Sequence, residues 1–106
     1  MKLEKDYQAQ LIKRIKKTFP DAIVLKNDSS YTQGIPDLSI LCKDKYAMLE
    51  VKRCKDAPRR PNQDYYLEKF GTMGAYASYI WPESEHIVME ELINYFGIKG
   101  AEDNAV

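Results

Sequence analysis

The stretch that decides the fold runs from residue 34 to residue 53 and reads Gly34-Ile-Pro-Asp-Leu-Ser-Ile-Leu-Cys-Lys-Asp-Lys-Tyr-Ala-Met-Leu-Glu-Val-Lys-Arg53. Two apolar runs flank a short charged centre, a pattern that is typical of a β-hairpin. A two-residue turn at Lys43-Asp44 makes Cys42 face Lys45 and makes Leu38 face Leu49 in an antiparallel pair. We therefore expect a hairpin whose register is set by this turn, and a different turn would shift that register.

The same register gathers charged residues at the open end of the hairpin. Asp37 faces Glu50, and because side chains alternate between the two faces of a strand, Lys52 shares their face. The Cβ atoms of directly opposed residues lie about 4.5–5.5 Å apart. Two carboxylates at that separation repel each other unless a cation lies between them or one of them is protonated. The pattern therefore predicts a cation site at this end of the hairpin, or a carboxyl group that keeps its proton.

Length and composition indicate one domain. The chain has 106 residues, of which 44% are hydrophobic, and this is enough for a single core. We expect one domain over residues 1–97 and a disordered tail over residues 98–106. No apolar run reaches ~18 residues, and the charged N-terminus is unlike a signal peptide. Cys42 and Cys54 lack metal-type spacing and are expected to be reduced. These features predict a cytoplasmic protein without membrane association, a class that includes phage- or virus-encoded proteins acting in a host cell.

The formal net charge is zero, but the charges are unevenly distributed. Residues 82–106 contain six acidic residues and one basic residue, whereas the other 81 residues contain 15 basic and 10 acidic ones. The basic residues gather at 13–17 and at 52–60. We interpret the first group as a solvated helix face and the second as a phosphate-binding surface.

Hydrophobic periodicity predicts three helices and four strands in the order αβββαβα. Apolar residues recur at helical spacing in residues 3–19, 61–73 and 84–96. Short apolar or β-branched runs at 22–26 and 75–81 are expected to be strands, as are the two arms of the hairpin. Pro61 is expected at the first position of its helix, and Ser84 is expected to cap the last helix. This order indicates an α/β fold.

A polar segment, residues 27–34, joins the first strand to the hairpin and ends at the expected cation site. It is rich in turn-forming residues. It could be a mobile flap that contacts a substrate through Ser30, Tyr31 or Gln33, or it could be a plain connector. Both interpretations stay open at the level of the sequence.

The residues at the open end of the hairpin suit a hard metal ion. The carboxylates of Asp37 and Glu50 and the backbone carbonyl of Val51 offer oxygen ligands of the kind that Mg²⁺ or Mn²⁺ prefers. Lys52 can position or deprotonate a water, or can offset charge at a phosphorus atom under attack. Zinc is disfavoured because the only histidine, His86, belongs to the last helix, where a surface position is expected. A metal, a water and a lysine are the components of phosphodiester hydrolysis.

The position of the Glu50-Val51-Lys52 triplet in the sequence supports a functional interpretation more than the triplet itself does. About two acid-x-Lys triplets are expected by chance at this composition, so the triplet alone has little meaning. Here it ends an apolar strand, and a Pro-Asp pair opens the preceding strand in register with it. A second such pair, Pro20-Asp21, ends a helix and precedes the wrong strand.

The motifs together resemble a known superfamily of nucleases. Gly34-x-Pro-Asp37 followed by Glu50-x-Lys52 is similar to the PD-(D/E)xK nucleases. The closest similarity is to their virus-type replication–repair nuclease (VRR-NUC) domains, which are related in fold to Holliday-junction resolvases. The resemblance covers about residues 4–81. It also includes Glu4 and Gln8 on the first helix, Gln63 at the start of the next helix, and Gly74-Ala75 before the last strand.

The resemblance implies a restriction-endonuclease-like αβββαβ core with a mixed central sheet, to which the C-terminal helix is an addition. It implies a homodimeric, structure-specific endonuclease that uses Mg²⁺, with Mn²⁺ able to substitute, and cuts branched DNA such as Holliday junctions or flaps. Asp37, Glu50, Lys52 and Gln63 would form the catalytic set. Glu4 would join Asp37, Glu50 and Val51 at the metal.

DNA contacts are expected from residues of the polar segment and of the second basic group, namely Ser30, Tyr31, Arg53, Lys55, Arg59 and Arg60. Arg60 departs from the family pattern, in which a small or apolar residue often stands at that position. Two other interpretations remain. A catalytically silent nuclease fold could bind DNA or a protein partner, although the intact Asp/Glu/Lys set argues against it. In the other, the hairpin is purely structural. This interpretation must explain why Glu50 and Lys52 end a buried strand, where an unpaired charge is costly.

Overall fold

The computed structural model describes residues 3–97, and it has the predicted order of elements. Only a short 3₁₀ turn (η1) is added before the last helix. The expected disordered tail, residues 98–106, lies outside the described residues. The elements are α1 (Glu4–Thr18), β1 (Ile23–Lys26), β2 (Leu38–Cys42), β3 (Lys45–Val51), α2 (Gln63–Thr72), β4 (Tyr76–Ile80), η1 (Pro82–Ser84) and α3 (Glu85–Phe96).

The four strands form one mixed sheet in the order β1-β2-β3-β4. The first three strands are antiparallel neighbours, and β4 lies parallel to β3 after the crossover through α2. In the β2–β3 hairpin Leu38 pairs with Leu49, and Cys42 pairs with Lys45. The register predicted from the turn at Lys43-Asp44 is therefore confirmed.

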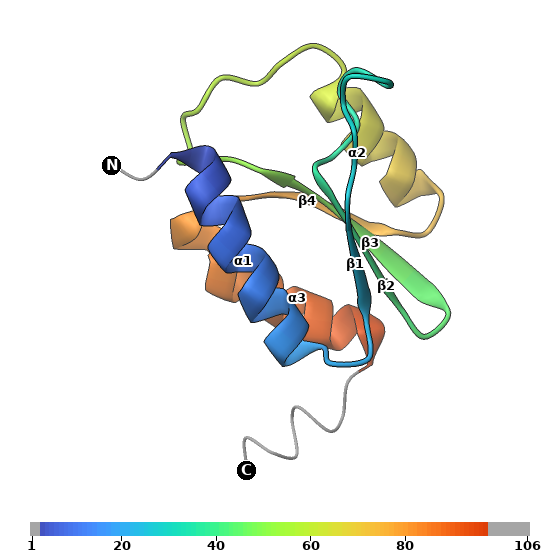
Figure 1. Cartoon of the computed structure of the whole chain (residues 1–106). Helices are drawn as coiled ribbons and strands as arrows, with labels where there is room; N and C mark the ends of the chain where they lie inside the picture. Colours follow the sequence, from blue (N-terminus) through green and yellow to red (C-terminus); the bar gives the residue numbers. More distant parts are fainter. Residues whose placement is uncertain (1–2, 98–106) are drawn as a thin grey trace.

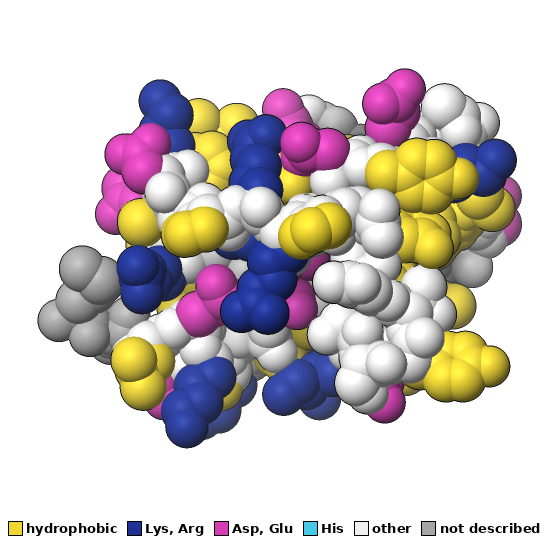
Figure 2. All heavy atoms as spheres, turned by 90° about the horizontal axis from the view of Figure 1, so that it is seen from above, with side chains coloured by type: hydrophobic (Ala, Val, Ile, Leu, Met, Phe, Trp, Pro, Cys, Tyr) yellow, Lys and Arg dark blue, Asp and Glu magenta, His cyan; other side chains and the backbone are white. Residues whose placement is uncertain are grey.

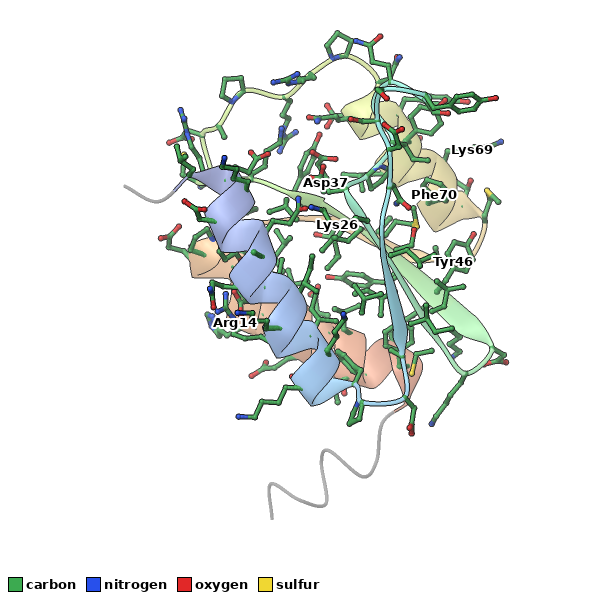
Figure 3. The ribbon with its side chains drawn as sticks, viewed as in Figure 1. Arg14, Lys26, Asp37, Tyr46, Lys69 and Phe70 are labelled. Atoms are coloured by element: carbon green, nitrogen blue, oxygen red, sulfur yellow. The ribbon has the colours of Figure 1, made fainter. Side chains whose placement is uncertain are left out.

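Helices cover both faces of the sheet, with α1 and α3 on one face and α2 on the other (Figure 1). The main core lies under α1 and α3, where Phe19, directly after α1, meets Phe96 of α3 with ring centroids 5.4 Å apart. Burying a side chain of this size stabilises the fold by about 1.5–3 kcal/mol. On the opposite face Tyr46 of β3 packs against Phe70 of α2, with ring centroids 6.4 Å apart (Figure 3). The alternation along β3 thus sends Ala47, Leu49 and Val51 into the core and the even-numbered residues, including position 50, toward α2.

The start of α2 differs from the prediction. The helix begins at Gln63 rather than at Pro61, because Asn62 adopts a left-handed conformation with φ of 71°. Asn62 is pressed against the segment before β2: a Cβ atom added to Gly34 would lie 2.5 Å from the Cβ of Asn62. Gly34 itself has φ of +90°, which favours glycine. This close approach ties the 27–34 segment to the N-terminus of α2.

Ser84 stands at the N-cap position of α3, as expected, but it does not cap the helix through its side chain. Instead its hydroxyl accepts a hydrogen bond from the Trp81 backbone N–H at 3.0 Å and closes the 3₁₀ turn. Gly97 ends α3 with φ of 69°, a conformation that favours glycine at the end of a helix. Within residues 3–97 no helix has the length and apolar character needed to cross a membrane.

Candidate functional site

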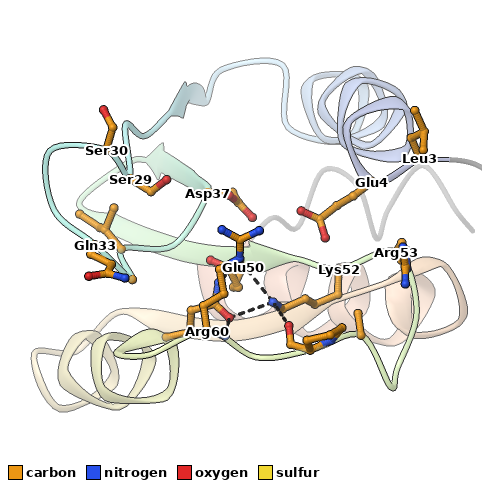
Figure 4. A pocket seen from close by; sticks show the side chains of 15 residues that line it. Leu3, Glu4, Ser29, Ser30, Gln33, Asp37, Glu50, Lys52, Arg53 and Arg60 are labelled. Carbon is orange, nitrogen blue, oxygen red and sulfur yellow. Dashed lines mark hydrogen bonds and ion pairs between the residues drawn. The ribbon is translucent and has the colours of Figure 1, made fainter.

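A pocket of about 960 Å³ opens at the end of the hairpin where Asp37 and Glu50 lie. Four parts of the chain surround it: the first turn of α1, the 27–35 segment, the end of β3, and residues 53–61, which we call the strap (Figure 4). Gln63, the first residue of α2, lines it as well. The site therefore depends on segments that are far apart in the sequence.

Asp37 and Glu50 stand where the predicted register puts them. Asp37 lies directly before β2, and its Oδ2 accepts a hydrogen bond from the Val51 backbone N–H at 2.8 Å. Glu50 points to the α2 face of the sheet and is only 3% exposed. A charged side chain in such a position is expensive unless it is paired.

One oxygen of Glu50 lacks a partner. Its Oε2 accepts a hydrogen bond from the Gln63 side-chain amide at 2.9 Å, and the Lys52 ammonium lies 4.0 Å away. Its Oε1 is buried and has no hydrogen-bond partner within the described residues. Burial and the neighbouring carboxylate of Asp37 raise the pKa of Glu50 to about 8. Glu50 is thus a carboxyl group that needs a proton or a cation.

The Lys52 ammonium is held at the bottom of the pocket. Its Nζ donates to the Pro58 carbonyl at 2.9 Å and to the Gln63 Oε1 at 2.8 Å. The side chain is buried, and its backbone N–H bonds to the Ile80 carbonyl of β4 at 2.8 Å. Lys52 therefore fastens the strap to the sheet in addition to balancing the charge of Glu50.

Gln63 joins these groups into one network. Its amide nitrogen donates to Glu50, while its oxygen accepts from Lys52 and from the Arg60 backbone N–H, the latter at 2.9 Å. The amide orientation is fixed by these partners, because a carboxylate can only accept and an ammonium can only donate. Gln63 consequently orients both charged side chains at the end of β3.

Glu4 brings a third carboxyl group to the pocket from the first turn of α1 (Figure 4). Burial and the charge of Asp37 raise the pKa of Glu4, whereas the charges of Lys52, Arg60 and Arg53 lower it. The carboxyl groups of Glu4 and Asp37 are therefore close enough to influence one another. Gln8, one turn further along α1, is not among the residues that line the pocket.

Three of the four expected metal ligands line the pocket with their side chains, and the fourth does not. Asp37, Glu50 and Glu4 line the pocket, but the Val51 side chain is fully buried in the core on the other face of the sheet. The Val51 backbone contributes an N–H that holds Asp37. Its expected role as a carbonyl ligand stays a prediction.

The expected DNA-binding residues also divide into two groups. Ser30, Arg53 and Arg60 line the pocket, whereas Tyr31, Lys55 and Arg59 do not. Tyr31 projects from the 27–34 segment and is 92% exposed. Ser30 is partly engaged already, because its backbone N–H and its hydroxyl both donate to the Asp28 carboxylate. The site therefore contains only part of the set expected to contact DNA.

Arg59 is occupied outside the pocket. Its guanidinium donates to Asp64 at 3.3 Å and lies over the ring of Tyr79, 4.3 Å from the centroid. The Tyr79 hydroxyl also donates to Asp64. These contacts hold the strap against α2 and β4.

Sequence reasoning missed several groups that shape the pocket. The Pro58 carbonyl, which receives the Lys52 ammonium, left no signal because any residue has a carbonyl. The Tyr79–Asp64 pair that holds Arg59 was not singled out either. Gly34 was named as part of a motif, but the motif does not show that Gly34 touches Asn62.

The donor set fits Mg²⁺ or Mn²⁺. Within residues 3–97 no three His, Cys, Asp or Glu side chains come together as a complete protein-built metal site. Mg²⁺ does not require one, because it keeps several waters and is commonly held by one or two carboxylates plus substrate phosphate. Asp37 and Glu50 supply two carboxylates, and the unpartnered Oε1 of Glu50 is a buried hard oxygen of the right kind.

Comparison with known proteins adds no further constraint. No protein-family model matches the chain, and neither does any curated protein. The functional assignment must accordingly come from the residues of the site.

Proposed function

We propose that the protein hydrolyses phosphodiester bonds in DNA with Mg²⁺ bound at Asp37 and Glu50, and that Mn²⁺ can substitute. One observation carries the proposal: the buried, unpartnered Oε1 of Glu50 lies in a pocket with Asp37, above a lysine that is itself buried. A bound Mg²⁺ would supply Lewis-acid chemistry and lower the pKa of a coordinated water.

Each residue of the network has a defined task in this reaction. The oxygen of a water forms a bond to phosphorus and one P–O ester bond breaks, so the products are a phosphate monoester end and a hydroxyl end. One water proton is released to solvent and the leaving oxygen gains one. Lys52 offsets the negative charge that gathers at phosphorus. Gln63 keeps Glu50 and Lys52 in a fixed relation through bonds of 2.9 Å and 2.8 Å.

The arrangement of elements supports membership in the PD-(D/E)xK group. The mixed sheet in the order β1-β2-β3-β4, with a helix before it and a crossover helix inside it, is the arrangement expected of a restriction-endonuclease-like core. In this proposal the closest type is VRR-NUC, α3 is an addition to the core, and the substrate is branched DNA such as Holliday junctions or flaps. A homodimer would cut such substrates in pairs.

Basic side chains near the pocket favour a phosphate-bearing substrate. Seen from above, Lys and Arg side chains cross the middle of the face, with acidic side chains beside them (Figure 2). Arg53, Lys55 and Arg60 of the strap are exposed, so they are available to a polyanion. Such contacts make binding fall with increasing salt.

A second candidate is a silent module that binds DNA or a protein partner without cutting. It is favoured by the bonding of Lys52, whose ammonium is directed to the Pro58 carbonyl and to Gln63 rather than to open space. In this case the network would serve only to hold the strap in place.

A cleavage panel separates the two candidates. The substrates are single strands, duplex, flaps, forks and four-way junctions, each with Mg²⁺ and with EDTA. We expect Mg²⁺-dependent cutting by the wild type and a loss of at least about 100-fold for Asp37→Asn and Lys52→Ala. Asp44→Asn, the same chemical change at the exposed turn of the same hairpin, is the control and should cut normally. A wild type that cuts nothing, or an Asp37→Asn variant that cuts normally, would contradict the proposal.

A further inference from the structure

Two neighbouring arginines of the strap have opposite surroundings. Arg59 is bonded to Asp64 and stacked on Tyr79, as described above. Arg60 lines the pocket, and its side chain extends from the strap into it, toward Asp37 (Figure 4). Within residues 3–97 no hydrogen bond or ion pair holds the Arg60 guanidinium. The two residues carry the same charge, but only one of them directs it at the carboxyl groups.

The backbone of Arg60 is fixed even though its guanidinium is free. Its N–H donates to the Gln63 Oε1 at 2.9 Å, and Gln63 is bonded to Glu50 and Lys52. The Cα of Arg60 is thereby tied to the network at the end of β3. The charge of its guanidinium is felt across the pocket, because it offsets part of the rise in the pKa of Glu4 on α1 that burial and Asp37 cause.

A phosphodiester that enters this pocket needs a donor for its non-bridging oxygens. Lys52 has little capacity left, because two of its three N–H donors go to Pro58 and Gln63 and its ammonium lies 4.0 Å from Glu50. A guanidinium offers a planar fork of donors that matches phosphate oxygens. Arg53 also lines the pocket, but it lies at the side nearer to Glu4 (Figure 4). Arg60 is the better placed of the two to share a phosphate with Asp37 and Glu50.

We propose that Arg60 is a catalytic residue that binds a non-bridging oxygen of the phosphodiester held at Asp37 and Glu50, whereas its neighbour Arg59 only anchors the strap. This inference rests on the proposed function, which it deepens by assigning the contact to the reacting phosphate. Removing Arg60 should therefore weaken the contact made at one phosphate, while removing Arg59 should leave that contact intact.

The binding test uses a thymidine pentamer with Ca²⁺, so that affinity is measured without turnover. We compare the wild type with Arg60→Ala, Arg60→Lys and Arg59→Ala, which is the same charge change one residue away. Loss of a charge-assisted contact predicts about 10- to 100-fold weaker binding for Arg60→Ala, with partial recovery in Arg60→Lys. Arg59→Ala should weaken binding by no more than about threefold. Equal losses in Arg60→Ala and Arg59→Ala would overturn the proposal, because they would reduce Arg60 to one more surface charge.

The cleavage test measures single-turnover rates at saturating protein with Mg²⁺. Arg60→Ala should cut at least about 10²-fold more slowly even when all DNA is bound, because its contact strengthens as charge develops at phosphorus. Arg59→Ala, which removes only an exposed anchor of the strap, should slow cutting by no more than about threefold once bound. A normal rate for Arg60→Ala in a protein whose wild type cuts would overturn the catalytic role, and thermal unfolding of each variant identifies any that fail to fold.

The outcomes separate this inference from the function on which it rests. If the wild type cuts nothing, the proposed function fails and with it the catalytic role of Arg60. The pentamer measurement then still decides whether the pocket holds a phosphate through Arg60. If the wild type cuts and the two alanine variants behave alike in both tests, the function stands and the role of Arg60 does not.

Discussion

The two ends of the β2–β3 hairpin are built from the same strands and treat their charges in opposite ways. At the turn, the Lys43 and Lys45 ammonium groups donate to the carbonyls of Gly97 and Tyr95, at 3.3 Å and 3.2 Å. Both lysines remain exposed. At the open end, Glu50 and Lys52 are only 3% and 6% exposed.

The two ends differ in how the protein accommodates charged side chains. The lysines at the turn satisfy the last carbonyls of α3, where a cation is favoured by the helix dipole, and they do so without leaving water. The open end buries two charged groups, and among residues 3–97 Glu50 Oε1 finds no hydrogen-bond partner. Burial of an unpartnered polar atom makes the fold less stable, and either a proton or the proposed cation at Glu50 would offset this cost.

The largest effect on the difference between the two ends of the hairpin is expected from neutralising Glu50. Glu50→Gln keeps the shape and removes the charge, so we expect cleavage to fall by at least about 100-fold and Mn²⁺ binding to disappear. Electron paramagnetic resonance of Mn²⁺ measures the second effect without any substrate. Asp44→Asn at the turn should change neither quantity. Retained Mn²⁺ binding in Glu50→Gln would mean that the cation site lies elsewhere.

The next largest effect should follow from removing the residue that connects the buried charges. Gln63→Leu leaves Glu50 and Lys52 without one hydrogen bond each, so the free energy of unfolding should fall by about 2–3 kcal/mol. Urea denaturation measures this change. Leu67→Ala in the same helix is a packing control that should destabilise the fold without altering the pH dependence. A stable Gln63→Leu variant would show that the network contributes little to the fold.

The pH dependence of stability tests the buried carboxyl group at the open end of the hairpin. The raised pKa of Glu50 means that the folded protein keeps a proton that the unfolded chain loses above pH 4.5. The resulting stability is present below pH 4.5 and is lost progressively as the pH rises to about 8. Metal-free protein should therefore unfold at a lower temperature at pH 8.5 than at pH 5.5, and added Mg²⁺ should reverse the loss.

Glu50→Gln is the control for this titration, because it should flatten the pH dependence in the absence of metal. The carboxyl group of Glu4, whose pKa is also raised, contributes in the same direction and would account for a remaining slope. A wild type that becomes more stable between pH 5.5 and pH 8.5 would contradict the assignment.

The smallest effect is expected at the turn. Lys43→Ala and Lys45→Ala each remove an exposed bond to a helix C-terminus, so each should lower the free energy of unfolding by less than about 1 kcal/mol. Neither variant should affect Mn²⁺ binding or cleavage. A larger loss would show that the two ends of the hairpin are less distinct than their exposures suggest.

Much of the fold and the centre of the site could be predicted because they follow from local rules. The charged turn fixed the register, and alternation along two strands then placed Asp37 and Glu50 together. The helical stripe that begins at Gln63 was equally readable. These features depend on periodicity and on one short turn, and both are determined by residues that are close together in the sequence.

The strap could not be predicted for the opposite reason. It has no periodicity, so its path is set by contacts with distant groups such as Tyr79 and Lys52. Arg59 and Arg60 look interchangeable in the sequence, and only the path of the backbone gives them different partners. The left-handed conformation of Asn62 likewise depends on a neighbour 28 positions earlier in the chain.

The contact between Gly34 and Asn62 has a consequence for how this sequence can vary. A side chain at position 34 would collide with position 62 and would also oppose the positive φ of residue 34. The two positions are therefore not free to change independently. Among sequences descended from a common ancestor with this one, glycine should persist at position 34 wherever the backbone at 61–62 approaches as closely. Another residue should appear at position 34 only together with a change at 61–62 that moves this backbone away.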